Sequence, residues 1–267
     1  MKAARIAIVL ATALGTAQAQ TGAPVAVYAA GSLRAALTEV SAGFERSRGV
    51  PVRLTFGASG LLRDRIAGGE AAQVFASANM DHPQALAAAG KAEPVQAFAR
   101  NALCVLAAPG WSLQGKTLPQ RLLDGDVKLG ISTPKADPSG DYAFEMFERI
   151  ESTGAAGPGS AAALKARALQ LTGGANSPPP PANRSVYGEL VAAGQADAFV
   201  TYCTNATLAR REQPQLQVLP VPDAVNVAAR YGVVLLQPVR GAAGDFVAYL
   251  LSPAGQAVLA SHGFSAP

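Results

Sequence analysis

Two serines stand at turns of small residues where each could donate hydrogen bonds to an anion. Ser32 lies in the turn 29–32 and Ser59 in the turn 57–60. A strand-like apolar run precedes each turn and helix formers follow it, so each serine occupies an expected helix N-cap. Free backbone N–H groups, a hydroxyl and the positive end of a helix dipole then meet at one place. This arrangement favours binding of an anion.

A third strand, turn and helix follow the same order, although their turn is longer. The strand-like run 128–132 leads to Ser139, ahead of an expected helix over 142–150. A single serine of this kind is an ordinary N-cap, but three such units favour a shared ligand. Tyr202 closes another apolar strand and offers a further hydroxyl, or a hydroxyl that simply lies in water. Arg184 stands at a helix start, where a cation opposes the helix dipole unless it faces a bound anion.

The elements that must position these side chains alternate between strand and helix along most of the chain. Such alternation predicts an α/β fold with mostly parallel sheets covered by helices. Ligands of these sheets bind beyond the carboxyl ends of the strands, where Ser32 and Ser59 fall. We expect two lobes: one from residues 20–101 and 208–267, the other from residues 102–207. Two crossings of the chain between the lobes would form a hinge suited to closure around a ligand.

The first 19 residues read as a cleavable signal peptide rather than as part of the fold. Lys2 and Arg5 precede the apolar run 6–14, and the small residues of 17–19 provide a cleavage site. The apolar run is too short to span a bilayer, which takes roughly 20 residues. We therefore expect export to the periplasm. An exported chain with 2 cysteines permits a disulfide or two buried thiols, and this choice stays open.

Composition and motifs argue against several other functions. The chain of 267 residues is 49% hydrophobic and 15% charged, with a net charge of +4, as in a globular protein. The longest basic run is the pair at 210–211, so nucleic acid is not an expected partner. Residues 110–117 match the phosphate-loop pattern G-x-x-x-x-G-K-T. However, Pro119 and the bulky side chains of the segment make nucleotide binding an unfavoured interpretation.

Catalysis through the serines would require a base. Only His82 and His262 are present, and no Gly-x-Ser-x-Gly turn surrounds any of the three serines. Histidine and cysteine form no cluster with metal-ligand spacing. We therefore expect no enzyme activity, no cofactor and no metal cation, and we keep an exported hydrolase of small anionic esters as the alternative from another class.

Several short motifs are shared with one known family. They are residues 27–33, 57–60, 74–78, 138–140, 200–202 with 205–206, and 251–257 through 264. On these motifs the chain resembles the periplasmic molybdate-binding proteins of ABC importers over nearly all of its mature length.

The resemblance implies a two-lobed, type II-like binding-protein fold with the ligand in the cleft. It further implies a monomer in the periplasm that binds molybdate or tungstate and passes it to an ABC permease in the inner membrane. A binder of another small anion, such as sulfate, a phosphonate or a carboxylate, is the alternative within the class.

The resemblance also assigns site residues. It implies that the hydroxyls of Ser32, Ser59 and Tyr202 hold the oxyanion. Ser139 falls where the family often has an alanine that donates through its backbone, and Arg184 falls at an apolar family position. We expect Arg184 to face the cleft, where its guanidinium would favour a fully charged oxyanion or a bidentate carboxylate or phosphonate. A slip of one or two residues would place Ser185 or Val186 there instead.

Overall fold

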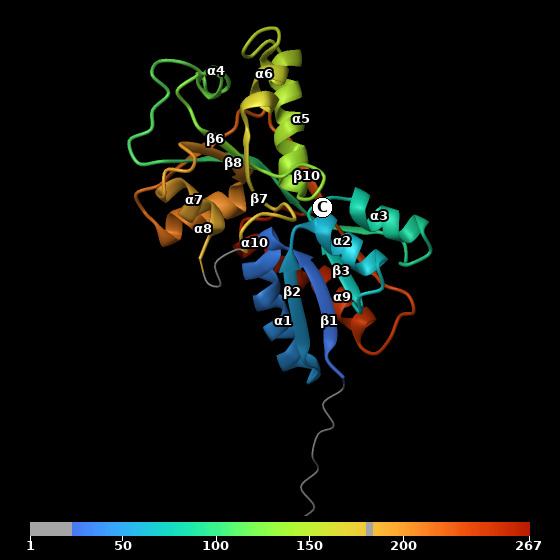
Figure 1. The fold of residues 1–267 in the computed structure, drawn as a ribbon. Helices are drawn as coiled ribbons and strands as arrows, with labels where there is room; N and C mark the ends of the chain where they lie inside the picture. Colours follow the sequence, from blue (N-terminus) through green and yellow to red (C-terminus); the bar gives the residue numbers. More distant parts are fainter. Residues whose placement is uncertain (1–22, 180–183) are drawn as a thin grey trace, which may run out of the picture.

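Residues 23–179 and 184–267 are described by the computed structural model, and they form two α/β lobes that lie side by side (Figure 1). Each lobe contains its own five-stranded sheet. The expected α/β class with two lobes is therefore confirmed. The expected signal peptide, residues 1–19, lies outside the described residues.

The first lobe is built around a sheet with the strand order β2-β1-β3-β10-β4. β1 is parallel to β2 and β3, whereas β10 is antiparallel to β3 and β4. Its strands are β1 (Val25–Ala30), β2 (Val52–Gly57), β3 (Val74–Ser77), β4 (Gln96–Asn101) and β10 (Ala229–Leu235). Its helices are η1 (Gly31–Leu33), α1 (Arg34–Arg48), α2 (Ser59–Ala67), α3 (Asp81–Ala88), α9 (Ala243–Leu251) and α10 (Pro253–Ser261).

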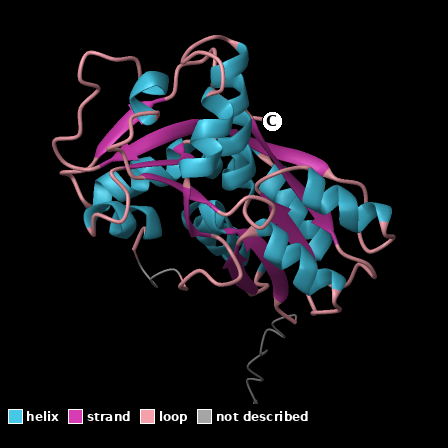
Figure 2. Ribbon diagram, turned by 45° about the horizontal axis from the view of Figure 1, so that its top comes forward, coloured by secondary structure: helices cyan, strands magenta, loops and turns pink. Residues whose placement is uncertain are grey.

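The second lobe has the strand order β7-β6-β8-β5-β9. β6 is parallel to β7 and β8, and β5 is antiparallel to β8 and β9. Its strands are β5 (Leu103–Ala107), β6 (Leu129–Ser132), β7 (Leu169–Thr172), β8 (Ala198–Tyr202) and β9 (Gln217–Pro220). Its helices are α4 (Leu118–Leu122), α5 (Pro138–Ser152), α6 (Ser160–Arg167), α7 (Val186–Ala192) and α8 (Cys203–Glu212). Figure 2 shows helices on both sides of the strands.

The return crossing to the first lobe comes later in the chain than the expected residue 208. That residue falls inside α8, and β9 beyond it pairs with β5 in the second sheet. Hydrogen bonding along β9 keeps the chain in the second lobe until residue 220, so the crossing lies between β9 and β10. The sequence did not predict this short strand, because it lies in the polar segment 211–223, which contains several prolines.

The two crossings are joined by one side chain. The Asn226 side-chain carbonyl accepts from the Leu103 N–H at 2.9 Å, and its amide donates to the Leu103 carbonyl at 3.1 Å. Both backbone groups of Leu103 are thus satisfied by the opposite crossing. This pairing keeps the two connections together at the hinge.

Burial explains why β1 and α1 form where they do. Val25, Val27 and Ala29 on one face of β1 are 0% exposed, and Tyr28 and Ala30 on the other face are also buried, as expected of a strand covered on both faces. On α1, Leu37, Val40 and Phe44 recur at helical spacing and are also fully buried. These contacts fix the turn between β1 and α1, and with it the position of Ser32.

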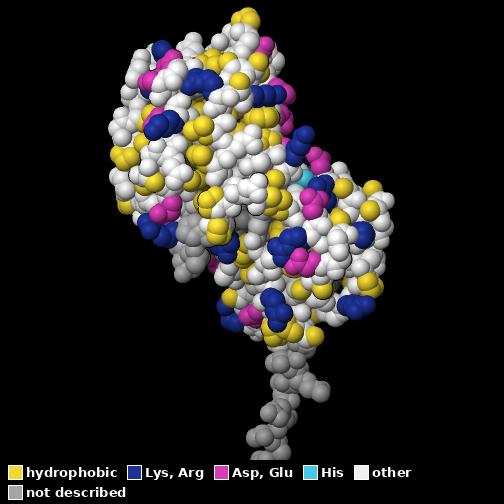
Figure 3. All heavy atoms as spheres, in the orientation of Figure 1, with side chains coloured by type: hydrophobic (Ala, Val, Ile, Leu, Met, Phe, Trp, Pro, Cys, Tyr) yellow, Lys and Arg dark blue, Asp and Glu magenta, His cyan; other side chains and the backbone are white. Residues whose placement is uncertain are grey.

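Among the described residues, no helix is long and apolar enough to cross a bilayer. Charged side chains of both signs are scattered over the face shown in Figure 3, without a continuous basic stripe.

Candidate ligand-binding site

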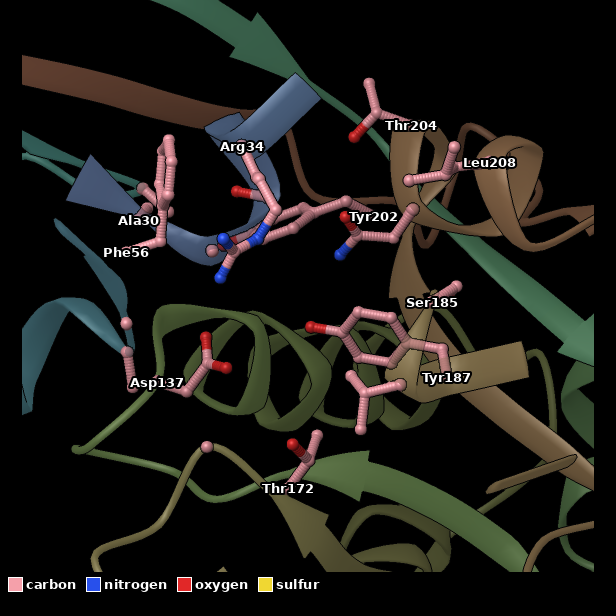
Figure 4. Close-up of a pocket in the computed structure, with 18 of the residues that line it drawn as sticks. Ala30, Arg34, Phe56, Asp137, Thr172, Ser185, Tyr187, Tyr202, Thr204 and Leu208 are labelled. Atoms are coloured by element: carbon pink, nitrogen blue, oxygen red, sulfur yellow. The ribbon is translucent and has the colours of Figure 1, made fainter. Parts of the chain in front are cut away.

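A cavity of about 500 Å³ lies between the lobes, walled by residues from both. The first lobe contributes the turns after β1 and β2. The second lobe contributes the loop after β7, the start of α7 and the junction of β8 and α8 (Figure 4). The wall includes Ser32, Ser59, Tyr202 and Arg184 but not Ser139. Four of the five expected ligand residues therefore lie on one cavity.

Ser32 lies in the short helix η1 and does not cap α1. The N-cap of α1 is Leu33, and no side chain caps either helix. The Ser32 hydroxyl instead lies 3.0 Å from the hydroxyl of Tyr231, 199 residues further along the chain. The N-cap assignment was wrong, because the 3₁₀ turn moves the start of α1 beyond the serine.

The partners of Tyr231 determine what Ser32 can donate. The Asn101 amide donates to the Tyr231 hydroxyl at 3.4 Å and to Thr204 Oγ1 at 2.8 Å. Burial raises the pKa of Tyr231 far above its usual value, so the phenol stays protonated. With Asn101 donating to it, the phenol can give its proton to Ser32 Oγ. The Ser32 proton is then free for an acceptor in the cavity.

Ser59 has the same donor capacity by a different route. It is the first residue of α2, is 1% exposed, and makes no side-chain cap to the helix. Its oxygen accepts from the Ala78 N–H at 3.1 Å, which leaves the hydroxyl proton available. Neither serine is thus an ordinary N-cap, and each has one free donor at the cavity wall.

Tyr202 presents a buried hydroxyl without a partner. The residue ends β8 and is 1% exposed, and its hydroxyl has no hydrogen bond to any described residue. Burial raises its pKa well above the usual value, so the group is a donor at neutral pH. Leaving such a group unsatisfied costs about 1–3 kcal/mol. A ligand acceptor in the cavity would remove that cost.

Asp137 takes the place that the sequence pattern gave to Ser139. Ser139 is fully buried away from the cavity wall, and its N–H donates to the Asp137 carboxylate at 3.1 Å. Asp137 is the N-cap of α5 and lines the cavity. Burial raises its pKa to about 6. Glu212 also lines the cavity and accepts from the Ser185 N–H at 2.7 Å, so the wall holds two acidic residues that the sequence did not indicate.

Arg184 lies at the cavity edge, but its charge is directed elsewhere. Its side chain is 61% exposed and forms an ion pair with Glu189 at 2.6 Å. Ser185 is the N-cap of α7 and accepts from the Gly188 N–H at 3.3 Å. This geometry does not favour the expected contact between the guanidinium and a ligand, because Glu189 on α7 already pairs with the charge.

The choice left open for the cysteines is settled by geometry. Cys104 on β5 and Cys203 at the start of α8 form a disulfide across a sequence separation of 99 residues. The bond therefore fixes the residue next to Tyr202 to the neighbouring strand of the second sheet.

The other chemical motifs are used structurally. Thr117 and Gln120 form a capping box at α4, Lys116 pairs with Asp124 at 2.7 Å, and this segment lies outside the cavity wall. His82 is buried with a lowered pKa because of desolvation, and His262 lies 2.9 Å from Glu39. No hydrogen bond joins either histidine to the described serines. Histidine, cysteine and acidic side chains form no metal-binding cluster in the described part of the chain.

Comparison with known proteins identifies the family. The model of the bacterial extracellular solute-binding proteins matches residues 25–265. The chain belongs to this family, whose members bind small solutes and deliver them to a membrane permease rather than act as enzymes. The family's extracellular location implies a place in the periplasm.

Two curated proteins are similar to this chain in sequence. An uncharacterized protein of Pasteurella multocida is 34% identical over 206 residues, which are 77% of this chain and 84% of the relative. The molybdate-binding protein ModA of Mycobacterium tuberculosis is 26% identical over 250 residues, 91% of this chain and 85% of the relative. The resemblance to periplasmic molybdate-binding proteins is confirmed.

Two solved structures share the fold. The periplasmic molybdate-binding protein of Azotobacter vinelandii has a TM-score of 0.69 at 20% identity, covering 91% of this chain and 99% of its own. PEB3 of Campylobacter jejuni with bound L-phospholactate has a TM-score of 0.68 at 16% identity, covering 91% and 100%. Both likenesses support the two-lobed fold.

Proposed function

We propose that this protein is the periplasmic binding component of an ABC importer for a small oxyanion, with molybdate and tungstate as its first ligands. It holds the anion through the hydroxyls of Ser32, Ser59 and Tyr202. The proposal rests chiefly on the Tyr202 hydroxyl, which is buried on the cavity wall without a partner. The free donors of the two serines and the molybdate-binding relatives support it.

Neutral donors suit this task. Each hydroxyl that donates to a charged oxygen contributes about 1.5–3 kcal/mol, and no desolvated cation is needed at the oxyanion itself. The protein would pass the anion unchanged to a permease in the inner membrane. It would bind sulfate more weakly, because shorter bonds leave some donors unsatisfied.

The proposal is tested by calorimetry and thermal shift with molybdate, tungstate, sulfate, phosphate and small carboxylates. Molybdate or tungstate should raise the melting temperature as expected for a ligand that binds only the folded state. Ser32→Ala and Ser59→Ala should each weaken binding roughly 10- to 150-fold. A larger shift with sulfate or a carboxylate would replace the assigned anion, and unchanged affinity in both variants would remove the serines from the site.

A further inference from the structure

The cavity is larger than an inorganic oxyanion requires. A tetrahedral oxyanion occupies the volume of a few water molecules, at roughly 30 Å³ each. The cavity measures about 500 Å³, within the range of pockets that hold small organic ligands. The lobes already touch beside it, since the Gly60 N–H of α2 donates to the Ala136 carbonyl of the second lobe at 2.8 Å. The extra space therefore exists although the lobes are in contact.

Arg34 lies on the wall of this space with its charge unpaired. It is the first residue of α1, and its guanidinium carbon lies 4.6 Å from the centre of the Phe56 ring. It forms no ion pair with any carboxylate of the described residues. A cation at the start of a helix opposes the dipole, so its own helix does not favour it. Stacking on Phe56 leaves the edge of the fork free for a planar anion.

The opposite wall provides an acidic acceptor, Asp137. Figure 4 shows Arg34 and Asp137 on opposite sides of the cavity, with the Tyr187 hydroxyl directed into the space between them. The Asp137 carboxylate accepts from the Ser139 N–H at 3.1 Å and keeps further acceptor capacity. A cation on one lobe and a carboxylate on the other match a ligand with an anionic group and a hydroxyl.

We propose that the cleft binds a small phosphorylated hydroxy acid, with its phosphate on Ser32, Ser59 and Tyr202 and its carboxylate on Arg34. Its hydroxyl donates to Asp137. The inference rests on the proposed oxyanion site, because the phosphate takes the place of the inorganic anion. The inference adds an organic ligand in place of the inorganic anion. It also adds the Arg34 guanidinium, which can pair bidentately with the carboxylate of that ligand.

The test compares three probes by calorimetry: inorganic phosphate, glycerol 3-phosphate and 3-phosphoglycerate. The two organic probes differ only in a hydroxymethyl group against a carboxylate. In the unaltered protein the carboxylate should strengthen binding at least about tenfold. Arg34→Ala should reduce this advantage to less than about twofold, and Arg34→Lys should restore only part of it. Arg46→Ala, an exposed arginine on the same helix outside the cavity wall, should leave the advantage unchanged.

Each outcome decides between the two proposals. If molybdate binds but 3-phosphoglycerate binds no better than inorganic phosphate, the organic ligand is rejected and the oxyanion site stands. An Arg34→Ala loss equal for both organic probes also rejects it, because the arginine then acts only through its general charge. If 3-phosphoglycerate binds tightly and molybdate does not, the inference holds and molybdate is rejected. If no probe binds and neither does molybdate, both proposals fall.

Discussion

The backbone N–H of Gly60 in the first lobe donates to the carbonyl of Ala136 in the second lobe at 2.8 Å. This hydrogen bond joins the start of α2 to the loop before α5 beside the cavity. A Cβ atom on Gly60 would lie 2.5 Å from the Lys135 carbonyl oxygen and 2.7 Å from that of Ala136. Two backbone oxygens cannot yield as a flexible side chain can, so the lobes meet here only because residue 60 is glycine.

Gly60→Ala should therefore hinder closure. We expect at least about a tenfold loss of ligand affinity, because closing the lobes would cost roughly 1.4 kcal/mol or more. Calorimetry measures the affinity, and small-angle scattering with saturating ligand measures whether the lobes close. Gly244→Ala is the matched control, since Gly244 is also the second residue of a helix and has open space around its Cβ position. Equal affinity in both variants would mean that the contact is not needed for binding.

Tyr231→Phe should weaken oxyanion binding although Tyr231 does not line the cavity. Without the phenol, Ser32 can direct its own proton to other acceptors, and we expect roughly a tenfold loss. The same change in a Ser32→Ala background should have little further effect, because the tyrosine acts through the serine. Calorimetry on the four proteins gives this coupling. Equal losses in both backgrounds would assign Tyr231 a structural role instead, and Tyr249→Phe on α9 serves as the control.

Because the pKa of Asp137 is raised, we expect both the stability of the protein and its anion affinity to depend on pH. Its folded pKa is about 6 against a usual value of 3.8, so the folded protein holds this proton more tightly than the unfolded chain does. The free energy of unfolding should fall as pH rises from about 4 to 6 and then level off. Anion affinity should rise below about pH 6, as the negative charge leaves the cavity wall.

Asp137→Asn, which can still cap α5, should flatten the Asp137 contribution to both curves. Denaturant titrations between pH 4 and 8 and calorimetry between pH 5 and 8 provide the check, with the best inorganic ligand as the probe. Asp141 lies nearby and its pKa is also raised by burial, so Asp141→Asn is measured in parallel. A pH dependence that survives Asp137→Asn and vanishes in Asp141→Asn would assign the effect to the other carboxylate.

Arg184→Ala should change ligand affinity by no more than about twofold. The guanidinium is mostly exposed and paired with Glu189, and exposed ion pairs contribute about 0–1 kcal/mol. Titration of this variant beside Arg34→Ala separates the contributions of these two arginines of the cavity wall, which also includes Arg211. A tenfold loss in Arg184→Ala would restore its expected contact with the ligand.

Local sequence patterns predicted the parts of the site that depend on neighbouring residues. The turns before Ser32 and Ser59 follow from an apolar strand, small residues and helix formers, and these are short-range signals. Tyr202 could be selected because an apolar strand ends there. The same logic selected Ser139, two residues beyond the actual N-cap, because Pro138 begins α5 and Asp137 takes the cap.

The features that the sequence did not predict depend on long-range contacts. Tyr231 reaches Ser32 across 199 residues of sequence, and no local pattern marks it. No local pattern marks Arg34 either, because its position opposite Asp137 depends on how the two lobes come together. The polar segment around β9 gave no strand signal, since β9 depends on pairing with β5 for its definition.

The disulfide between Cys104 and Cys203 has a consequence for when the binding site is completed. The bond joins Cys104 to a residue 99 positions later in the sequence, Cys203, which directly follows Tyr202. The cytoplasm keeps thiols reduced, whereas the periplasm oxidises them. In a periplasmic protein the two cysteines would therefore stay thiols until the chain leaves the cytoplasm. Pairing of β5 with β8 already holds Tyr202 beside Leu103, and the covalent cross-link next to it would form only in the oxidising compartment.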